Sequence, residues 1–394
     1  MKIQKIESEK KRNNCNILTN KLYIITKLDI IIPRLVKVVI LLKCSHVGDD
    51  IMKDFVFSNV TEIVNYTKNS SDKGFVIFSG VETILELSKQ MSSNIILCST
   101  AGEYSRNGYK DGIISGFEFD LAQAEIVEIP NPPIKNIKNL KQAYSKVRGN
   151  KNAFAFLLCD GLNGTEESVV TTFYFTDNNF KIIGGSAGDN LKFKETFIFI
   201  GNKKVNSVVI FFDMNKRTQI IRENIYESSG KRLLITDSDL ISRTVKTFNK
   251  APASTEYARI LNIREQDLPN YFMNNPLGKI YEDEIYIASP MKVNSDKSIT
   301  FYCQMMSDTF VDILKPVDPV QQMRKTIKEV EFKPSFVLAI NCILRSLKFQ
   351  QEGLWKSIDS ELLSLCPNVT GFISYGEQFY NKHVNQTMVL LAIE

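Results

Sequence analysis

The chain has 394 residues, of which 43% are hydrophobic, and it carries 49 Lys and Arg against 44 Asp and Glu, for a formal charge of +5. This length allows about two to three domains with sizeable cores. Acidic and basic residues are interleaved and no arginine stripe with interspersed aromatic residues appears, so the composition does not favour a nucleic-acid-binding surface.

The seven cysteines are scattered and contain no C-x-x-C pair. A disulfide framework or a structural zinc site would cluster them, so we expect a reducing compartment, the cytoplasm, and no metal site. The apolar stretch 28–42 is interrupted by Pro33, Arg34 and Lys37 and is shorter than the ~20 apolar residues of a membrane helix. We therefore predict no targeting or membrane segment, and a strand at 37–43.

From Lys73 onward, short apolar runs with β-type residues alternate with runs that carry apolar residues at helical spacing. Two units, each with a strand, a helix, a strand, a turn and further strands, are predicted between about 73 and 214. A weaker third copy is predicted at the end of the chain. Strands are predicted at 74–80, 94–99, 112–129, 151–160, 180–185, 195–201, 206–214, 275–290, 298–305 and 336–347, and helices at 81–91, 165–175, 251–263 and 352–366. The last segment, 368–394, is predicted to form a strand, a polar loop and a final strand.

These elements predict an α/β fold (mixed α+β) made of two related halves, with mixed sheets flanked by helices. We place a poorly defined segment at 1–50, a first domain at 51–225 and a second at 226–394. The boundary lies in a charged stretch that follows Met214.

One turn recurs at the ends of strands. It reads CSTAGE at 98–103, GGSAGD at 184–189 and, more loosely, SYGE at 374–377. The second copy spells G-x-S-x-G, the nucleophile elbow of serine hydrolases, which needs a helix after the serine. A loop and a strand are predicted there instead, so a hydrolase that uses Ser186, with Glu377 and His383, stays the least favoured alternative.

Two other roles are open for these turns. Gly and Ala permit tight packing, and the Ser, Thr and carboxylate groups can satisfy backbone N–H groups. The same groups can instead line a cleft at the strand ends, where ligands bind in many α/β folds. The candidate ligand-binding residues are Ser99, Thr100, Glu103, Ser186, Asp189, Arg345, Glu377, Gln378, His383 and Asn385.

Three further observations bear on ligands. No phosphate-binding glycine motif occurs, which does not favour a nucleotide enzyme. The two histidines, His46 and His383, have no cluster of metal ligands beside them, but either could serve as an axial haem ligand. Arg345 lies in an apolar element and, if buried, needs a carboxylate such as Glu377 or an anionic ligand.

The segments CSTAGEYSRNGYKDG, LLCDGLNGTEESVV, KIIGGSAGD and GFISYGEQFYNKHVNQT resemble the FIST sensory module, from about residue 73 to 394. The resemblance implies a non-enzymatic signal-input domain that binds small ligands, with amino acids as one suggestion. Bacterial members are often fused to, or encoded beside, histidine kinases, diguanylate cyclases or chemoreceptors, and some are haem proteins that sense nitric oxide. No such output segment is recognised here, so we expect a separate signalling partner.

Overall fold

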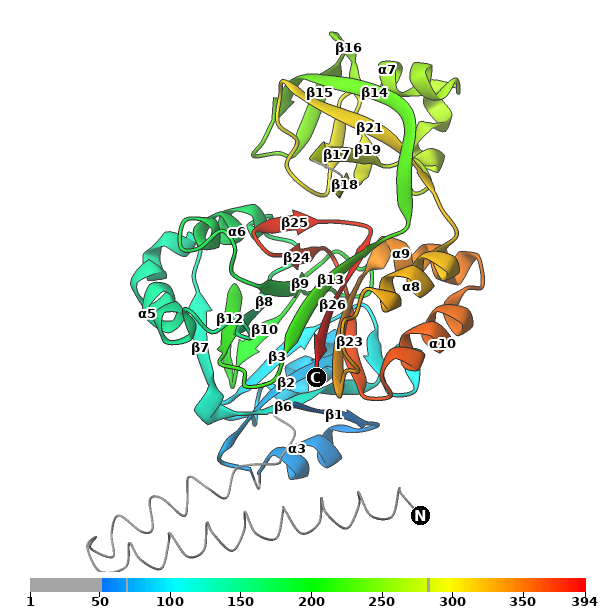
Figure 1. Cartoon of the computed structure of the whole chain (residues 1–394). Helices are drawn as coiled ribbons and strands as arrows, with labels where there is room; N and C mark the ends of the chain where they lie inside the picture. Colours follow the sequence, from blue (N-terminus) through cyan, green and yellow to red (C-terminus); the bar gives the residue numbers. More distant parts are fainter. Residues whose placement is uncertain (1–51, 69, 282–283) are drawn as a thin grey trace, which may run out of the picture. The chain divides into compact units, whose positions relative to one another are not determined.

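The computed structural model describes residues 52–68, 70–281 and 284–394. The strand predicted at 37–43 and the candidate His46 lie outside these residues. Within them the chain forms four sheets with helices on their outer faces (Figure 1). This arrangement confirms the predicted mixed α/β class.

The first sheet has the strand order β1-β6-β2-β3-β10-β11, and only β2 and β3 are parallel neighbours. Helix α4 connects these two strands, as the sequence predicts, and packs with α3 on one face of the sheet. The bounds are β1 Met52–Phe57, α3 Val60–Lys68, β2 Lys73–Ser79, α4 Val81–Leu87, β3 Ile95–Ser99, β6 Ile114–Asp120, β10 Ile198–Ile200 and β11 Lys203–Val205.

The second sheet repeats this plan with the order β7-β12-β8-β9-β24-β25. Strands β8 and β9 are parallel, α6 connects them, and α5 packs beside α6. The bounds are β7 Ala124–Ile129, α5 Ile137–Val147, β8 Phe154–Cys159, α6 Glu166–Tyr174, β9 Ile182–Ser186, β12 Ser207–Phe212, β24 Glu377–Phe379 and β25 Lys382–Val384.

The third sheet repeats the plan again, with the order β13-β26-β22-β23-β4-β5. Strands β22 and β23 are parallel, α9 and α10 connect them, and α8 packs beside them. The weak third copy predicted from the sequence is thereby confirmed. The bounds are β4 Glu103–Ser105, β5 Gly108–Lys110, β13 Thr218–Asn224, α8 Pro319–Lys328, β22 Phe336–Cys342, α9 Ile343–Gln351, α10 Trp355–Leu365, β23 Val369–Ser374 and β26 Thr387–Ile393.

Each copy gives its hairpin to another sheet. The β4–β5 hairpin follows β3 of the first sheet but pairs with β23 of the third. The β24–β25 hairpin follows β23 and pairs with β9 of the second sheet, and the β10–β11 hairpin follows β9 and pairs with β3 of the first. The three exchanges form a closed ring.

The inner faces of these three sheets share one apolar core. Phe78 of β2 stacks on Phe372 of β23 at 4.6 Å between ring centroids, and meets Phe156 of β8 edge-on at 6.3 Å. Because both faces of the central strands are covered, their sequences read as continuous apolar runs.

The fourth sheet lies between β13 and α8 in the chain and has its own core, with α7 Ala253–Leu261 against it. Figure 1 shows β14 as a long curved strand that leads into it. Its strands are β14 Tyr226–Asp239, β15 Thr244–Phe248, β16 Ala251–Pro252, β17 Leu277–Tyr281, β18 Glu284–Ala288, β19 Pro290–Val293, β20 Ile299–Phe301 and β21 Thr309–Pro316.

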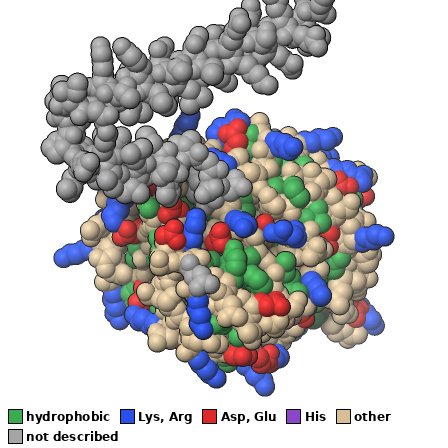
Figure 2. Space-filling view, turned by 90° about the horizontal axis from the view of Figure 1, so that it is seen from below, with side chains coloured by type: hydrophobic (Ala, Val, Ile, Leu, Met, Phe, Trp, Pro, Cys, Tyr) green, Lys and Arg blue, Asp and Glu red, His purple; other side chains and the backbone are tan. Residues whose placement is uncertain are grey.

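On the face seen in Figure 2, Lys and Arg side chains are interspersed with Asp and Glu rather than gathered in a patch of one sign. The described residues include no helix long and apolar enough to cross a membrane.

Candidate functional site

The three repeated turns meet where the three sheets exchange their hairpins. The N–H of Ala101 donates to the carbonyl of Ile373 at 3.1 Å, and that of Gly188 to the carbonyl of Ser99 at 2.9 Å. The N–H of Ser186 donates to the carbonyl of Gly376 at 2.8 Å. Each turn is therefore hydrogen-bonded to both of the others, and segments that lie far apart in the sequence come together.

Two of the turn carboxylates are fully buried within this junction. Glu103 accepts hydrogen bonds from the Thr100 hydroxyl at 2.5 Å and from the N–H groups of Gly112 and Ile113 at 3.1 and 3.3 Å. Burial raises the pKa of Glu103 to about 7, against the opposing effect of the Thr100 hydrogen bond. This carboxyl group ties the first turn to the loop before β6.

Glu377 repeats this arrangement in the third copy. It accepts hydrogen bonds from the Ser374 hydroxyl at 2.7 Å and from the Thr387 hydroxyl and N–H at 2.8 and 3.2 Å. Burial raises its pKa to about 7. The roles of Glu103 and Glu377 match the structural alternative for these turns.

Asp189 holds the second turn differently. It accepts hydrogen bonds from the Tyr375 hydroxyl at 2.5 Å and from the backbone N–H groups of residues 193–195. Burial opposes ionisation, but these hydrogen bonds outweigh it and hold the pKa of Asp189 below its usual range. The Tyr375 hydroxyl also accepts from the N–H of Leu191 at 2.7 Å, so its ring is fixed in place.

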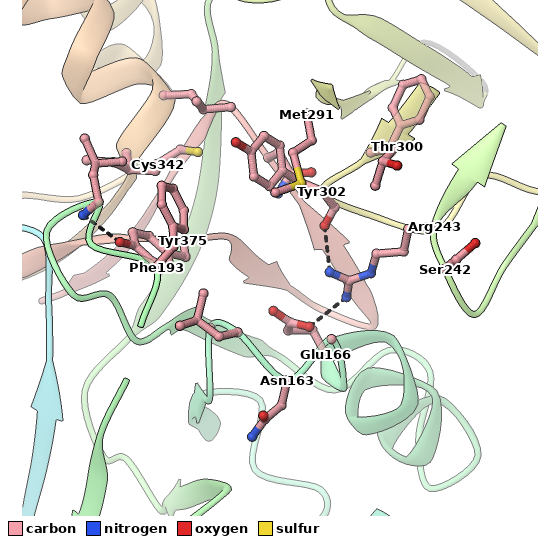
Figure 3. A pocket seen from close by; sticks show the side chains of 18 of the residues that line it. Asn163, Glu166, Phe193, Ser242, Arg243, Met291, Thr300, Tyr302, Cys342 and Tyr375 are labelled. Carbon is pink, nitrogen blue, oxygen red and sulfur yellow. Dashed lines mark hydrogen bonds and ion pairs between the residues drawn. The ribbon is translucent and has the colours of Figure 1, made fainter. Parts of the chain in front are cut away.

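That ring forms part of the wall of a pocket of about 280 Å³ (Figure 3). The pocket is enclosed by the loop before α6, the turn after β9, the β14–β15 turn and β19–β20 of the fourth sheet, and the start of α9. Its lining residues are Gly161, Leu162, Asn163, Gly164, Glu166, Leu191, Phe193, Ile241, Ser242, Arg243, Met291, Thr300, Phe301, Tyr302, Cys342, Ile343, Leu344, Tyr375 and Asn385. At this volume it suits a small ligand.

Arg243 and Glu166 are the two charged residues that line the pocket. Nη2 of Arg243 lies 2.7 Å from Oε2 of Glu166 and 2.5 Å from Oε2 of Glu167, and Nη1 donates to the carbonyl of Tyr302 at 2.9 Å. Burial opposes the charge of Arg243, but the two carboxylates outweigh it and raise its pKa. The β14–β15 turn is thereby fixed to the start of α6.

Asn385 is the predicted site residue that lines the pocket directly. Ser186 and Gln378 lie one contact away: the amide of Gln378 donates to the Ser186 hydroxyl at 3.1 Å, and this hydroxyl donates to Oε1 of Glu166 at 3.2 Å. Ser99 and Thr100 are buried and do not line the pocket.

The surroundings of Ser186 are not those of a catalytic nucleophile. It ends β9, it is fully buried, and the next regular element is strand β10. The predicted loop and strand after this turn are therefore confirmed, and the helix that an elbow requires does not follow the serine.

Arg345 is fully buried on α9, and its ion-pair partner is Glu223 of β13. Nη1 also donates to the Glu223 carbonyl at 3.1 Å. The prediction that Glu377 pairs directly with Arg345 is therefore wrong. Glu223 lies beside α9 because β13 is part of the third sheet, and the local sequence does not indicate these strand pairings. Burial raises the pKa of Glu223 against the opposing charge of Arg345.

His383 lines a neighbouring pocket of about 240 Å³. Its Nδ1 lies 3.5 Å from the Gln378 amide nitrogen, and a Cβ added to Gly376 would lie 3.1 Å from its Nε2 and 2.3 Å from its Cε1. Nε2 is buried, and the 240 Å³ of this pocket lies below the roughly 300–1,000 Å³ of sites that hold drug-sized ligands, so it leaves no room for a porphyrin. In this arrangement the residues around His383 do not fit a haem.

Glu166 and Arg243 were not among the candidates predicted from the sequence. Glu166 could have been noticed as an acid in the first turn of a helix whose other inward residues are apolar. Arg243 gives no local signal, because its partners lie 76 and 77 residues away.

Two family models together match most of the chain. The FIST N domain model matches residues 74–251, and the FIST C domain model matches residues 253–380. The chain belongs to the FIST family. No curated protein matches the sequence. FIST domains are generally taken as small-ligand sensory domains of signalling proteins, and the pocket draws its lining from both matched regions.

Proposed function

We propose that this FIST protein is a small-ligand sensor that binds its ligand in the pocket beside Arg243 and passes occupancy to a separate signalling protein in the cytoplasm. The pocket itself carries the proposal, because it is small, largely apolar, and has a few convergent polar groups. The FIST family membership supports a sensory rather than an enzymatic role.

The ion pairs of Arg243 suggest how occupancy is transmitted. This residue lies in the β14–β15 turn, which connects two strands of the fourth sheet, whereas Glu166 and Glu167 begin α6 on the second sheet. A ligand in the pocket contacts both the β14–β15 turn and the start of α6. It favours the relative position of these two elements to which it binds better, which is a shift of populations. The partner would read that arrangement.

A thermal-shift screen of the full chain against amino acids, small carboxylates and haem tests the proposal. A ligand of the native state should stabilise by about 2.7 kcal/mol at a hundredfold excess over its Kd. Asn163 is exposed and lines the pocket, so Asn163→Trp should abolish this stabilisation.

Asn139→Trp on α5 provides the matched control, because Asn139 is exposed and does not line the pocket. It should keep the stabilisation. A ligand that stabilises both variants equally binds elsewhere and contradicts the proposed site.

A further inference from the structure

The wall of the pocket is rich in aromatic side chains. Phe193, Phe301, Tyr302 and Tyr375 all line it, together with several aliphatic residues. The rings of Phe193 and Tyr375 stack at 5.4 Å between centroids and 26° between planes. The face of an aromatic ring carries negative potential, so it attracts a cation as well as an apolar group. This wall therefore accommodates an apolar body that carries a positive charge.

Carboxylates surround the same wall. Glu166 lines the pocket itself, and three further carboxylates accept hydrogen bonds from lining residues. These bonds run to Asp160 from the N–H groups of Leu162 and Asn163 at 2.9 and 3.2 Å, to Glu167 from Arg243 at 2.5 Å, and to Asp189 from the Tyr375 hydroxyl at 2.5 Å. The surroundings of the pocket are therefore acidic.

Arg243 is the cation that opposes these groups. Within the part of the chain that the structure describes, no other lysine or arginine side chain lines the pocket or is hydrogen-bonded to a lining residue. Its charge is shared between Glu166 and Glu167. Backbone N–H groups stabilise Asp160 and Asp189 but do not neutralise them. Charges are weakly screened inside a protein, so the negative excess favours a cationic ligand and opposes an anionic one.

Glu166 can also contact a cation directly. Figure 3 shows its carboxylate beside the guanidinium of Arg243 at the edge of the pocket. Oε1 accepts from the Ser186 hydroxyl at 3.2 Å and Oε2 from Arg243 at 2.7 Å, and each carboxylate oxygen can accept a second hydrogen bond. An ammonium group that leaves water for a largely apolar pocket needs such a partner.

We infer that the ligand is a small protonated amine with an apolar or aromatic body and no carboxylate group. The ammonium group lies beside Glu166, and the body lies against Phe193 and Tyr375. This inference rests on the proposed function and names the ligand class of that site. It distinguishes an amine from an amino acid, because the carboxylate of an amino acid would lie among the carboxylates of the protein.

Isothermal titration of the full chain with four matched probes tests it: phenethylamine, 2-phenylethanol, phenylalanine and 3-phenylpropionate. Phenethylamine should bind most tightly. Its neutral analogue 2-phenylethanol should bind at least about tenfold more weakly, the value of one hydrogen bond to a charged group. Phenylalanine and 3-phenylpropionate carry a carboxylate and should also bind at least about tenfold more weakly than phenethylamine.

Glu166→Gln keeps the size and one accepting oxygen and removes the charge. It should weaken the binding of phenethylamine at least about tenfold and leave that of 2-phenylethanol unchanged. Glu125→Gln is the matched control, because it removes the same charge from β7 and Glu125 does not line the pocket. It should bind phenethylamine as the wild type does. A Glu166→Gln variant that keeps the full preference for phenethylamine overturns the inference.

If Glu166→Gln does not fold, the exposed part of the wall provides a second variant. Phe193 is 47% exposed, and Phe193→Leu keeps an apolar contact but removes the ring face. Phenethylamine should then bind about fivefold more weakly, with a smaller loss for 2-phenylethanol. An equal loss for the two probes, or no loss for either, contradicts a cationic ligand on this wall.

The outcomes separate this inference from the proposed function. Tighter binding of 2-phenylethanol, phenylalanine or 3-phenylpropionate than of phenethylamine, abolished by Asn163→Trp, overturns the amine assignment and leaves the pocket as the ligand site. Binding of phenethylamine that survives Asn163→Trp overturns the assignment too. No binding of any probe also overturns it, and the broader thermal-shift screen then decides whether the pocket binds ligand at all.

Discussion

The guanidinium of Arg243 lies 2.7 Å from the carboxylate of Glu166, and this ion pair joins the fourth sheet to the second beside the pocket. The Glu166 side chain is 3% exposed and that of Arg243 is 17% exposed. Removal of the cation would leave two carboxylates close together, one of them buried.

We therefore expect Arg243→Ala to lower the free energy of unfolding by about 3 kcal/mol, at the lower end for a buried ion pair because Arg243 is partly exposed. Urea denaturation measures this loss. In the matched control, Arg264→Ala removes an ion pair whose arginine side chain is 74% exposed, which should cost less than about 1 kcal/mol. Equal losses in the two variants would contradict a structural role for Arg243.

The buried carboxyl group of Glu103 makes a contribution to the free energy of unfolding that depends on pH. Its pKa is about 7 in the folded chain against an ordinary value of 4.5, so between these values the folded state keeps a proton that the unfolded state has lost. The contribution of Glu103 to stability is thus highest below pH 4.5 and falls by about 3 kcal/mol as the pH rises to 7.

Glu103→Gln removes this titration and leaves every other group. The difference in free energy of unfolding between the wild type and the variant should change by about 3 kcal/mol between pH 4.5 and 7.5, in favour of the variant at high pH. Urea denaturation across this range measures it. Parallel pH curves for the two proteins would rule out the predicted titration.

Gly371 of β23 adopts a φ of +145°, and a Cβ there would lie 1.8 Å from the carbonyl oxygen of Ala339 on the neighbouring strand. Gly371→Ala should therefore cost several kcal/mol or prevent folding. Gly80 has a φ of −62° and no atom within 4 Å of an added Cβ. Gly80→Ala should cost less than about 1 kcal/mol in the same denaturation experiment.

The position of His383 makes a spectroscopic prediction. Because the ring nitrogens face Gln378 and Gly376, protein purified from haem-supplied cells should show no Soret band that depends on this residue. An absorption spectrum of the wild type and of His383→Ala tests this. A Soret band that disappears in the variant would show that the loop rearranges to bind haem.

Much of the fold could be predicted from the sequence. Strands β2, β3, β8 and β9 are continuous apolar runs, since both of their faces are buried, and α4, α6 and α7 carry apolar residues at helical spacing. Helices α5 and α8 were missed because few of their residues are buried and most are polar. The hairpin exchange could not be predicted, since its strands are three residues long.

The site was less accessible to sequence reasoning. The repeated turns drew attention to Ser186 and Asp189, which lie beside the pocket because the turns mark the strand ends, and the last loop of the chain drew attention to Asn385, which lines the pocket. The same pattern also selected Glu103 and Glu377, whose carboxyl groups accept hydrogen bonds from their own turns and so have a structural role. Local sequence cannot distinguish a carboxylate that caps its own turn from one that faces a cavity.

The ring of exchanged hairpins has a consequence for any attempt to divide the protein. A fragment that ends near residue 251 would contain β4 without β23, and β9 without β24. Each half would then expose unpaired strand edges and should aggregate when made alone. Co-expressed halves should complement each other and restore a soluble complex, so the two family modules constitute one cooperative folding unit rather than two interchangeable parts.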